Sequence, residues 1–161
     1  MADVIIAELE PAGRSGELIR ELVDVWQASV EATHAFLDAD EVARIRGYVP
    51  QALAGVSRLV VASAGSGGLE GEKPIGFMGV EGGRLEMLFL APEWRGRGVG
   101  GRLLRHGMSR MGVTELTVNE QNPDAVGFYE HLGFRTFRRS EKDERGGPYP
   151  ILCMRLEGAA A

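Results

Sequence analysis

A glycine- and arginine-rich segment between an apolar run and an amphipathic helix constrains this chain more than any other feature. Residues 84–104 read RLEMLFLAPEWRGRGVGGRLL, so an expected strand ends at Pro92 and an expected helix follows from about Gly98. The first N–H groups of a helix have no partners within it and lie at the positive end of the helix dipole. Glycines let a large anion approach this backbone, and Arg95 and Arg97 add fixed positive charge. The segment therefore predicts a turn that binds pyrophosphate.

The hydrophobic patterns predict one domain, residues 1–161, of the α/β (α+β) class. Three successive strands joined by turns indicate an antiparallel meander, and the composition of residues 65–74 is typical of an exposed hairpin loop. Pro50 is expected to break the helical pattern that precedes it. The expected strands are 4–9, 58–64, 75–80, 85–90, 116–118, 134–139 and 151–156. The expected helices are 15–32, 38–46, 98–110 and 122–132.

The composition excludes several classes of protein. A single cysteine, Cys153, provides no disulfide framework and no pair of thiolate ligands, so we expect a cytoplasmic protein without a metal. The amino terminus does not resemble a signal peptide, and no apolar stretch approaches the length of a membrane span. A net charge of −5 argues against a general nucleic-acid binder and favours cationic partners. We therefore expect neither nucleic acid nor membrane among its partners.

Two other phosphate-binding motifs compete for the glycine segment. A nucleotide-hydrolase loop ends in Gly-Lys-Ser or Gly-Lys-Thr, whereas this chain continues Gly101-Arg102-Leu103. The dinucleotide motif GxGxxG fits Gly96, Gly98 and Gly101, and Glu120 lies near the spacing of a ribose-binding acid. That motif should open a series of parallel βαβ units, but a meander precedes it here. A dinucleotide-binding oxidoreductase therefore remains the less favoured alternative.

A third interpretation joins the segment to the carboxyl half of the chain. Arg95-x-x-Gly98-x-Gly100, with its preceding strand, resembles the acetyl-CoA motif of the GCN5-related N-acetyltransferases, the GNAT family. Residues 118–134, VNEQNPDAVGFYEHLGF, resemble the second cofactor motif of that family, with Asn122 followed seven residues later by Tyr129. Shorter motifs are similar to those of the YjaB-type bacterial acetyltransferases. These are ATHAFL at 32–37, VNEQN at 118–122, AVGFY at 125–129, RSE at 139–141 and PYP at 148–150.

The resemblance implies a GNAT fold, a mixed and mostly antiparallel sheet of about seven strands flanked by four helices. It implies an N-acetyltransferase that moves the acetyl group of acetyl-CoA to a primary amine by direct attack in a ternary complex, without a metal. The acceptor would be a small-molecule or peptide amine, and a homodimer is possible. A non-catalytic acyl-CoA-binding regulatory module is the alternative. The cofactor-binding residues carried over are Leu88, Phe89, Leu90, Arg95, Gly96, Arg97, Gly98, Val99, Gly100 and Asn122.

The resemblance also carries over Tyr129 as the general acid that assists departure of the CoA thiolate. With ordinary pKa values of about 8.5 for a thiol and about 10 for tyrosine, full proton transfer is uphill by roughly 2 kcal/mol, which favours hydrogen-bond donation that matures into transfer. The general base stays open. The candidates are Glu120, His34, Glu86, and Asn119 acting through a water.

Overall fold

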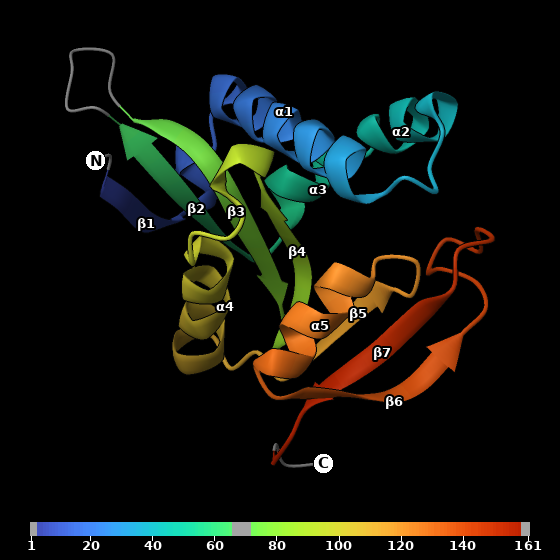
Figure 1. Ribbon diagram of the computed structural model, residues 1–161. Coiled ribbons are helices and arrows are strands. Elements are labelled where there is room, and N and C mark those ends of the chain that lie inside the picture. Colours follow the sequence, from blue (N-terminus) through green and yellow to red (C-terminus); the bar gives the residue numbers. More distant parts are fainter. Residues whose placement is uncertain (1–2, 66–71, 159–161) are drawn as a thin grey trace.

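The protein is described by a computed structural model over residues 3–65 and 72–158, so most of the loop expected at 65–74 lies outside the described residues. One seven-stranded sheet in the order β1-β2-β3-β4-β5-β7-β6 forms the centre of the molecule (Figure 1). Every neighbouring pair is antiparallel except β4 and β5, which confirms the meander and the mixed sheet. The strands are β1 (Asp3–Leu9), β2 (Arg58–Gly65), β3 (Lys73–Glu81), β4 (Arg84–Leu90), β5 (Glu115–Asn119), β6 (Phe134–Ser140) and β7 (Ile151–Leu156).

Helices cover both faces of this sheet. The α-helices in the described residues are α1 (Gly16–Thr33), α2 (Ala39–Arg46), α3 (Val49–Gly55), α4 (Val99–Arg110) and α5 (Pro123–His131). The short helix α3 corrects the expectation that Pro50 breaks the helical pattern. Pro50 lies in the first turn of α3, where the missing N–H costs no helical hydrogen bond.

The core has two layers because β-strand side chains alternate between the faces of the sheet. On β2, Leu59 and Val61 pack into the cluster under α1, α2 and α3, whereas Val60 and Ala62 pack into the cluster under α4 and α5. Figure 1 shows α1 and α4 on opposite sides of the strands. None of the helices over residues 3–65 and 72–158 is long and apolar enough to cross a membrane.

The sheet opens between its two central strands. Within the described residues β4 and β5 pair only through Arg84 with Glu115 and Leu85 with Leu116, although both strands continue beyond these pairs. A register shift against β3 at Gly79 and Val80 leaves one extra residue in β4, and such a bulge bends a strand. The remainder of β4 therefore presents backbone to the gap rather than to β5.

Candidate active site

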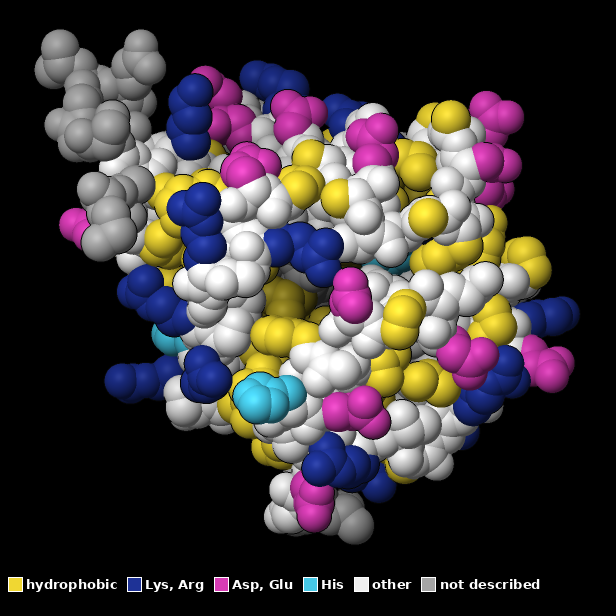
Figure 2. All heavy atoms as spheres, viewed as in Figure 1, with side chains coloured by type: hydrophobic (Ala, Val, Ile, Leu, Met, Phe, Trp, Pro, Cys, Tyr) yellow, Lys and Arg dark blue, Asp and Glu magenta, His cyan; other side chains and the backbone are white. Residues whose placement is uncertain are grey.

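A cavity of about 960 Å³ occupies the gap between β4 and β5. Its walls are the later part of β4, the end of β5, the start of α4, the inner face of α5, the end of α1 and residues 143–145. Figure 2 shows an apolar hollow in the surface, with basic and acidic side chains around its rim. The cavity thus connects the glycine-rich turn to the end of α1, which are far apart in the sequence.

The glycine-rich turn forms one end of this cavity. Gly96 and Gly98 have φ angles of 76° and 84°, in the left-handed region that L side chains rarely adopt. Helix α4 starts immediately after them without a side-chain cap, whereas Ser15, Asp38 and Asn122 cap α1, α2 and α5. The first N–H groups of α4 are therefore free to bind an anion. We call this end, residues 95–101, the cradle.

The basic residues of the cradle divide into two groups. Arg95 lines the cavity and lies 3.7 Å from a carboxylate oxygen of Asp124. Arg97 stacks over the Trp94 ring at 4.9 Å from its centroid and is not among the residues that line the cavity. Arg105, in the second turn of α4, does line it, although the sequence analysis did not select it. No sequence signal marks Arg105, because arginines are common on the exposed faces of helices.

The other expected cofactor residues lie along the same cavity. Leu88, Phe89 and Leu90 line it from β4, and Gly96, Gly98 and Gly100 line it from the cradle. Val99 is instead buried in the core, so only its backbone could contribute. A Cβ on Gly100 would lie 3.3 Å from Leu90 Cδ1, so a glycine there lets α4 approach β4 closely. A free strand edge and an uncapped helix start fit the arm and the pyrophosphate of a CoA molecule.

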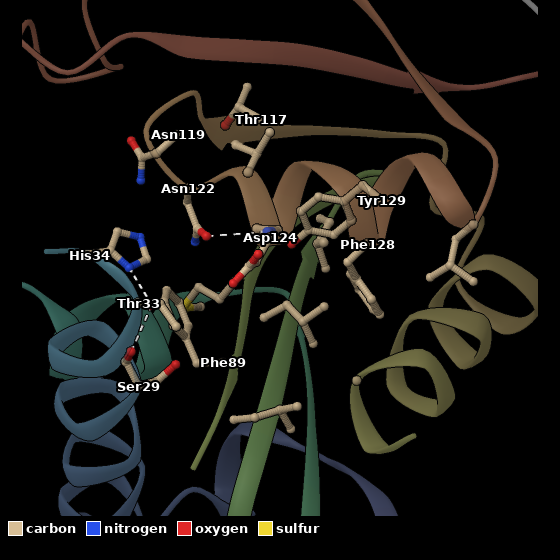
Figure 3. Close-up of a pocket in the computed structure, with 18 of the residues that line it drawn as sticks. Ser29, Thr33, His34, Phe89, Thr117, Asn119, Asn122, Asp124, Phe128 and Tyr129 are labelled. Atoms are coloured by element: carbon tan, nitrogen blue, oxygen red, sulfur yellow. Dashed lines mark hydrogen bonds between the residues drawn. The ribbon is translucent and has the colours of Figure 1, made fainter. Parts of the chain in front are cut away.

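The cavity is also lined by Asn122, which precedes α5, and by Tyr129 within it. Asn122 also caps the helix, since its side chain accepts a hydrogen bond of 3.3 Å from Ala125 N–H. Tyr129 is only 8% exposed and packs edge-on against Phe128 and Phe134, with ring centroids 5.3 and 6.2 Å away. Burial raises the pKa of Tyr129, so its hydroxyl stays protonated at neutral pH and can donate a hydrogen bond. Figure 3 shows the Tyr129 ring projecting from α5 beside Phe128.

His34 stands at the opposite end of the cavity, where α1 ends. Its Nδ1 lies 2.7 Å from Thr33 Oγ1 (Figure 3). Its ring centroid is 5.2 Å from that of Phe36. Burial lowers the pKa of His34 below its ordinary value, because a partly desolvated imidazole resists the second proton. The imidazole is therefore neutral at pH 7 and able to accept a proton.

The structure separates the other base candidates. Glu86 and Asn119 line the cavity, and burial raises the pKa of Glu86 against the opposing effect of Arg84. Glu120 is not among the residues that line the cavity. Its carboxylate accepts hydrogen bonds of 2.5 and 3.1 Å from Arg139. These hydrogen bonds are the main reason that the pKa of Glu120 is lowered. The structure thus brings His34, Glu86 and Asn119 together with Tyr129, and leaves Glu120 outside.

The loop between β6 and β7 completes the His34 end, and the sequence analysis missed it as part of the site. Asp143, Glu144 and Arg145 line the cavity. Glu144 accepts hydrogen bonds from Arg84 and from Thr117 Oγ1. We call the end formed by His34, Glu86 and residues 143–145 the acidic end. No local pattern could have shown it, because its members come from three separate segments.

Further contacts hold this loop against the segments that join α1 to α2 and α2 to α3. Arg145 lies over the Tyr48 ring at 4.9 Å from its centroid, and the Tyr149 ring lies 5.7 Å from that of Phe36. Cation–π and aromatic pairs of this kind each contribute about 0.5–1.5 kcal/mol. The loop is therefore held against the helical segments at two points.

Comparison with protein families and curated proteins gives consistent matches. A family model described as an acetyltransferase (GNAT) domain matches residues 55–136. The peptidyl-lysine N-acetyltransferase YjaB of Escherichia coli K12 is 40% identical over 139 residues, which are 86% of this chain and 90% of that protein. The protein of the same name from Salmonella typhimurium is 36% identical over 83% of this chain and 88% of its own length.

Solved structures agree with these matches. The solution structure of apo-form YjaB from Escherichia coli has a TM-score of 0.80 and 37% identity, covering 98% of this chain and 99% of that one. The PaiA N-acetyltransferase from Thermoplasma acidophilum, in complex with coenzyme A, has a TM-score of 0.68 and 22% identity, covering 96% and 99% of the two chains. The Thermoplasma acidophilum structure, at this lower identity, shows that the two proteins share a fold.

Proposed function

We propose that this chain, which belongs to the GNAT family of acetyltransferases, transfers the acetyl group of acetyl-CoA to the side-chain amine of a lysine in a peptide or protein. The family match and the relatives make it an N-acetyltransferase. The proposal for the acceptor depends on one observation. The cavity joins an anion-binding cradle at one end to acidic residues and a neutral histidine at the other, and Tyr129 lines it as well.

At the cradle, the backbone is the main binding group. The N–H groups at the start of α4 and the side chain of Arg95 would hold the pyrophosphate, and the free edge of β4 at Leu88–Leu90 would pair with the amide-containing arm. The bound cosubstrate supplies an activated acetyl thioester. The uncapped N-terminus of α4 and the two left-handed glycines support this assignment.

Tyr129 is proposed to donate a hydrogen bond to the departing sulfur. Its raised pKa keeps the proton on the oxygen in the free protein, and it widens the gap to the pKa of a thiol. Hydrogen-bond donation is therefore favoured over complete proton transfer. The edge-on packing against Phe128 and Phe134 holds the ring in one position.

His34 is proposed as the general base. A lysine amine with a pKa of about 10.4 is almost entirely ammonium at pH 7, so a group in the site must accept its proton before the nitrogen attacks. His34 is neutral and lines the cavity, and it is therefore preferred to Glu120, whose carboxylate is occupied by Arg139. Glu86 lies in the same cavity and is the second choice.

The acidic end supports a cationic acceptor. Glu86, Asp143 and Glu144 line it, and their carboxylates would attract an ammonium group during encounter. A lysine side chain is a slender cationic group, and the relatives with the highest identity given above are named as peptidyl-lysine enzymes. These observations together favour a peptide lysine over a neutral amine.

A comparison of acceptors tests the proposal. Acetyl-CoA consumption would be followed with a peptide that carries one lysine and an acetylated amino terminus, with its lysine-to-arginine counterpart as control, and with spermidine. We expect kcat/KM for the lysine peptide to exceed that for spermidine by about tenfold or more, a difference of about 1.4 kcal/mol in transition-state binding. Binding of acetyl-CoA without turnover of either amine would indicate a regulatory module instead.

A further inference from the structure

We propose that Thr33 is a positioning residue that fixes the proton of the neutral His34 ring on Nδ1, so that Nε2 is free to accept the proton of the acceptor amine. The part of this inference that concerns catalysis rests on the proposed function. The part that concerns the ring proton does not, because it follows from hydrogen bonds within the chain.

The argument begins with the hydroxyl of Thr33. Thr33 Oγ1 donates a hydrogen bond of 2.8 Å to the carbonyl oxygen of Ser29, one turn earlier in α1. A hydroxyl has one hydrogen and two acceptor lone pairs. Its only hydrogen is therefore used, and towards any other partner Thr33 Oγ1 can act solely as an acceptor.

The second contact of the same hydroxyl decides the state of the histidine. Nδ1 of His34 lies 2.7 Å from Thr33 Oγ1, within hydrogen-bond distance. Because Oγ1 has no hydrogen left to donate, Nδ1 must carry the hydrogen in this contact. A neutral imidazole has one N–H, so Nε2 is left with a lone pair. These two hydrogen bonds, from Nδ1–H to Thr33 Oγ1 and from Thr33 Oγ1–H to the Ser29 carbonyl, thus select one tautomer.

The surroundings of the ring are consistent with this role. Figure 3 shows the second ring nitrogen of His34 on the side away from Thr33, facing Asn119 and Asn122 across the cavity. Phe36 covers the ring from the α1–α2 segment. The charged groups that line the same cavity near this end are Glu86, Asp143, Glu144 and Arg145. Nε2 is therefore the ring atom presented to an incoming ammonium.

The first measurement is the tautomer itself. In the protein without ligand, the nitrogen chemical shifts of the His34 imidazole at pH 8 distinguish a protonated Nδ1 from a protonated Nε2. We expect the wild-type ring to carry its hydrogen on Nδ1, and Thr33→Val to shift the population towards Nε2–H. A wild-type ring protonated on Nε2 overturns the proposal. This measurement is made on the wild-type protein alone, so it depends neither on the folding of a variant nor on the identity of the acceptor.

The second measurement is turnover with the single-lysine peptide. Thr33→Val is expected to lower kcat by about tenfold and to leave the KM for acetyl-CoA unchanged. The loss is smaller than the 10²- to 10⁴-fold that a positioned general base contributes, because the base itself is still present. Thr33→Ser keeps the hydroxyl and should restore both kcat and the tautomer. Thr136→Val, on the exposed edge strand β6, removes a hydroxyl away from the cavity and serves as the control.

The outcomes separate this inference from the proposed function. Unchanged kcat in Thr33→Val, with a changed tautomer, shows that Thr33 does not act in the reaction and overturns the proposal. Loss of kcat in Thr33→Ser to the same extent as in Thr33→Val also overturns it, because the hydroxyl is then irrelevant. If the wild-type protein acetylates no lysine peptide, the proposed acceptor is wrong, while the tautomer measurement still tests the hydrogen-bond chain.

Discussion

The two ends of the cavity use different parts of the polypeptide. The cradle is made of consecutive residues whose main chain is the proposed binding group, and Gly96 and Gly98 in it have left-handed φ angles. The acidic end is made of side chains, with His34, Glu86 and Glu144 brought together from three segments. A ligand common to a whole family suits a backbone site, whereas an acceptor that differs between members suits side chains. Substitutions at the two ends should therefore change different kinetic constants.

The largest effect is expected where the two ends meet. Tyr129→Phe removes the hydroxyl and keeps the ring packing, so kcat should fall by about 10²-fold or more with the fold intact. The affinity for acetyl-CoA should be unchanged, because the proposed role of the hydroxyl is to act on the departing sulfur rather than on the cradle. Steady-state kinetics and calorimetric titration of acetyl-CoA measure the two effects. Equal losses in kcat and in affinity would instead indicate a binding role for Tyr129.

The next effect tests the backbone of the cradle. A side chain at Gly98, where φ is 84°, is strained, so Gly98→Ala should weaken acetyl-CoA binding by about tenfold, the equivalent of a strain of 1–2 kcal/mol. The KM for the amine should change little.

Gly127→Ala is the matched control for Gly98→Ala. Gly127 lies in α5, has an ordinary φ and has open space around its Cβ position. Alanine there should stabilise the helix by about 0.5–1 kcal/mol and leave acetyl-CoA binding intact. Equal binding losses in both variants, measured by calorimetry, would mean that the conformation of the cradle is not the cause.

A smaller effect is expected at the acidic end. Glu144→Gln loses the ion pair with Arg84 and one negative charge at the proposed acceptor site, so the KM for a lysine peptide should rise by about three- to fivefold, as expected for a partly exposed ion pair. The KM for acetyl-CoA should stay the same. Glu141→Gln, in the same loop but 88% exposed, is the control. A rise in the KM for acetyl-CoA alone would contradict the division between the ends.

The same division explains what could be predicted from the sequence. The cradle and the helix starts at Ser15, Asp38 and Asn122 were predictable, because each depends on residues a few positions apart. The acidic end was not, because Arg84, Thr117 and Glu144 meet only after the sheet has formed. Helix α3 was missed for a local reason, since a proline breaks a helix interior and is tolerated in its first turn. Sequence patterns show local backbone geometry, while contacts between distant segments require the fold.

The smallest effect is expected at Glu120, which the sequence offered as a base candidate. Its carboxylate is bound to Arg139, and this contact lowers its pKa, so it is a weak proton acceptor, and it does not line the cavity. Glu120→Gln should leave kcat and both KM values unchanged, and exposed ion pairs contribute so little that the melting temperature should not move measurably. A pH–rate profile of the variant is the deciding measurement. A loss of kcat with a shifted acidic limb would make Glu120 the base and remove His34 from that role, and the acidic end would then have to include β5 beyond Asn119.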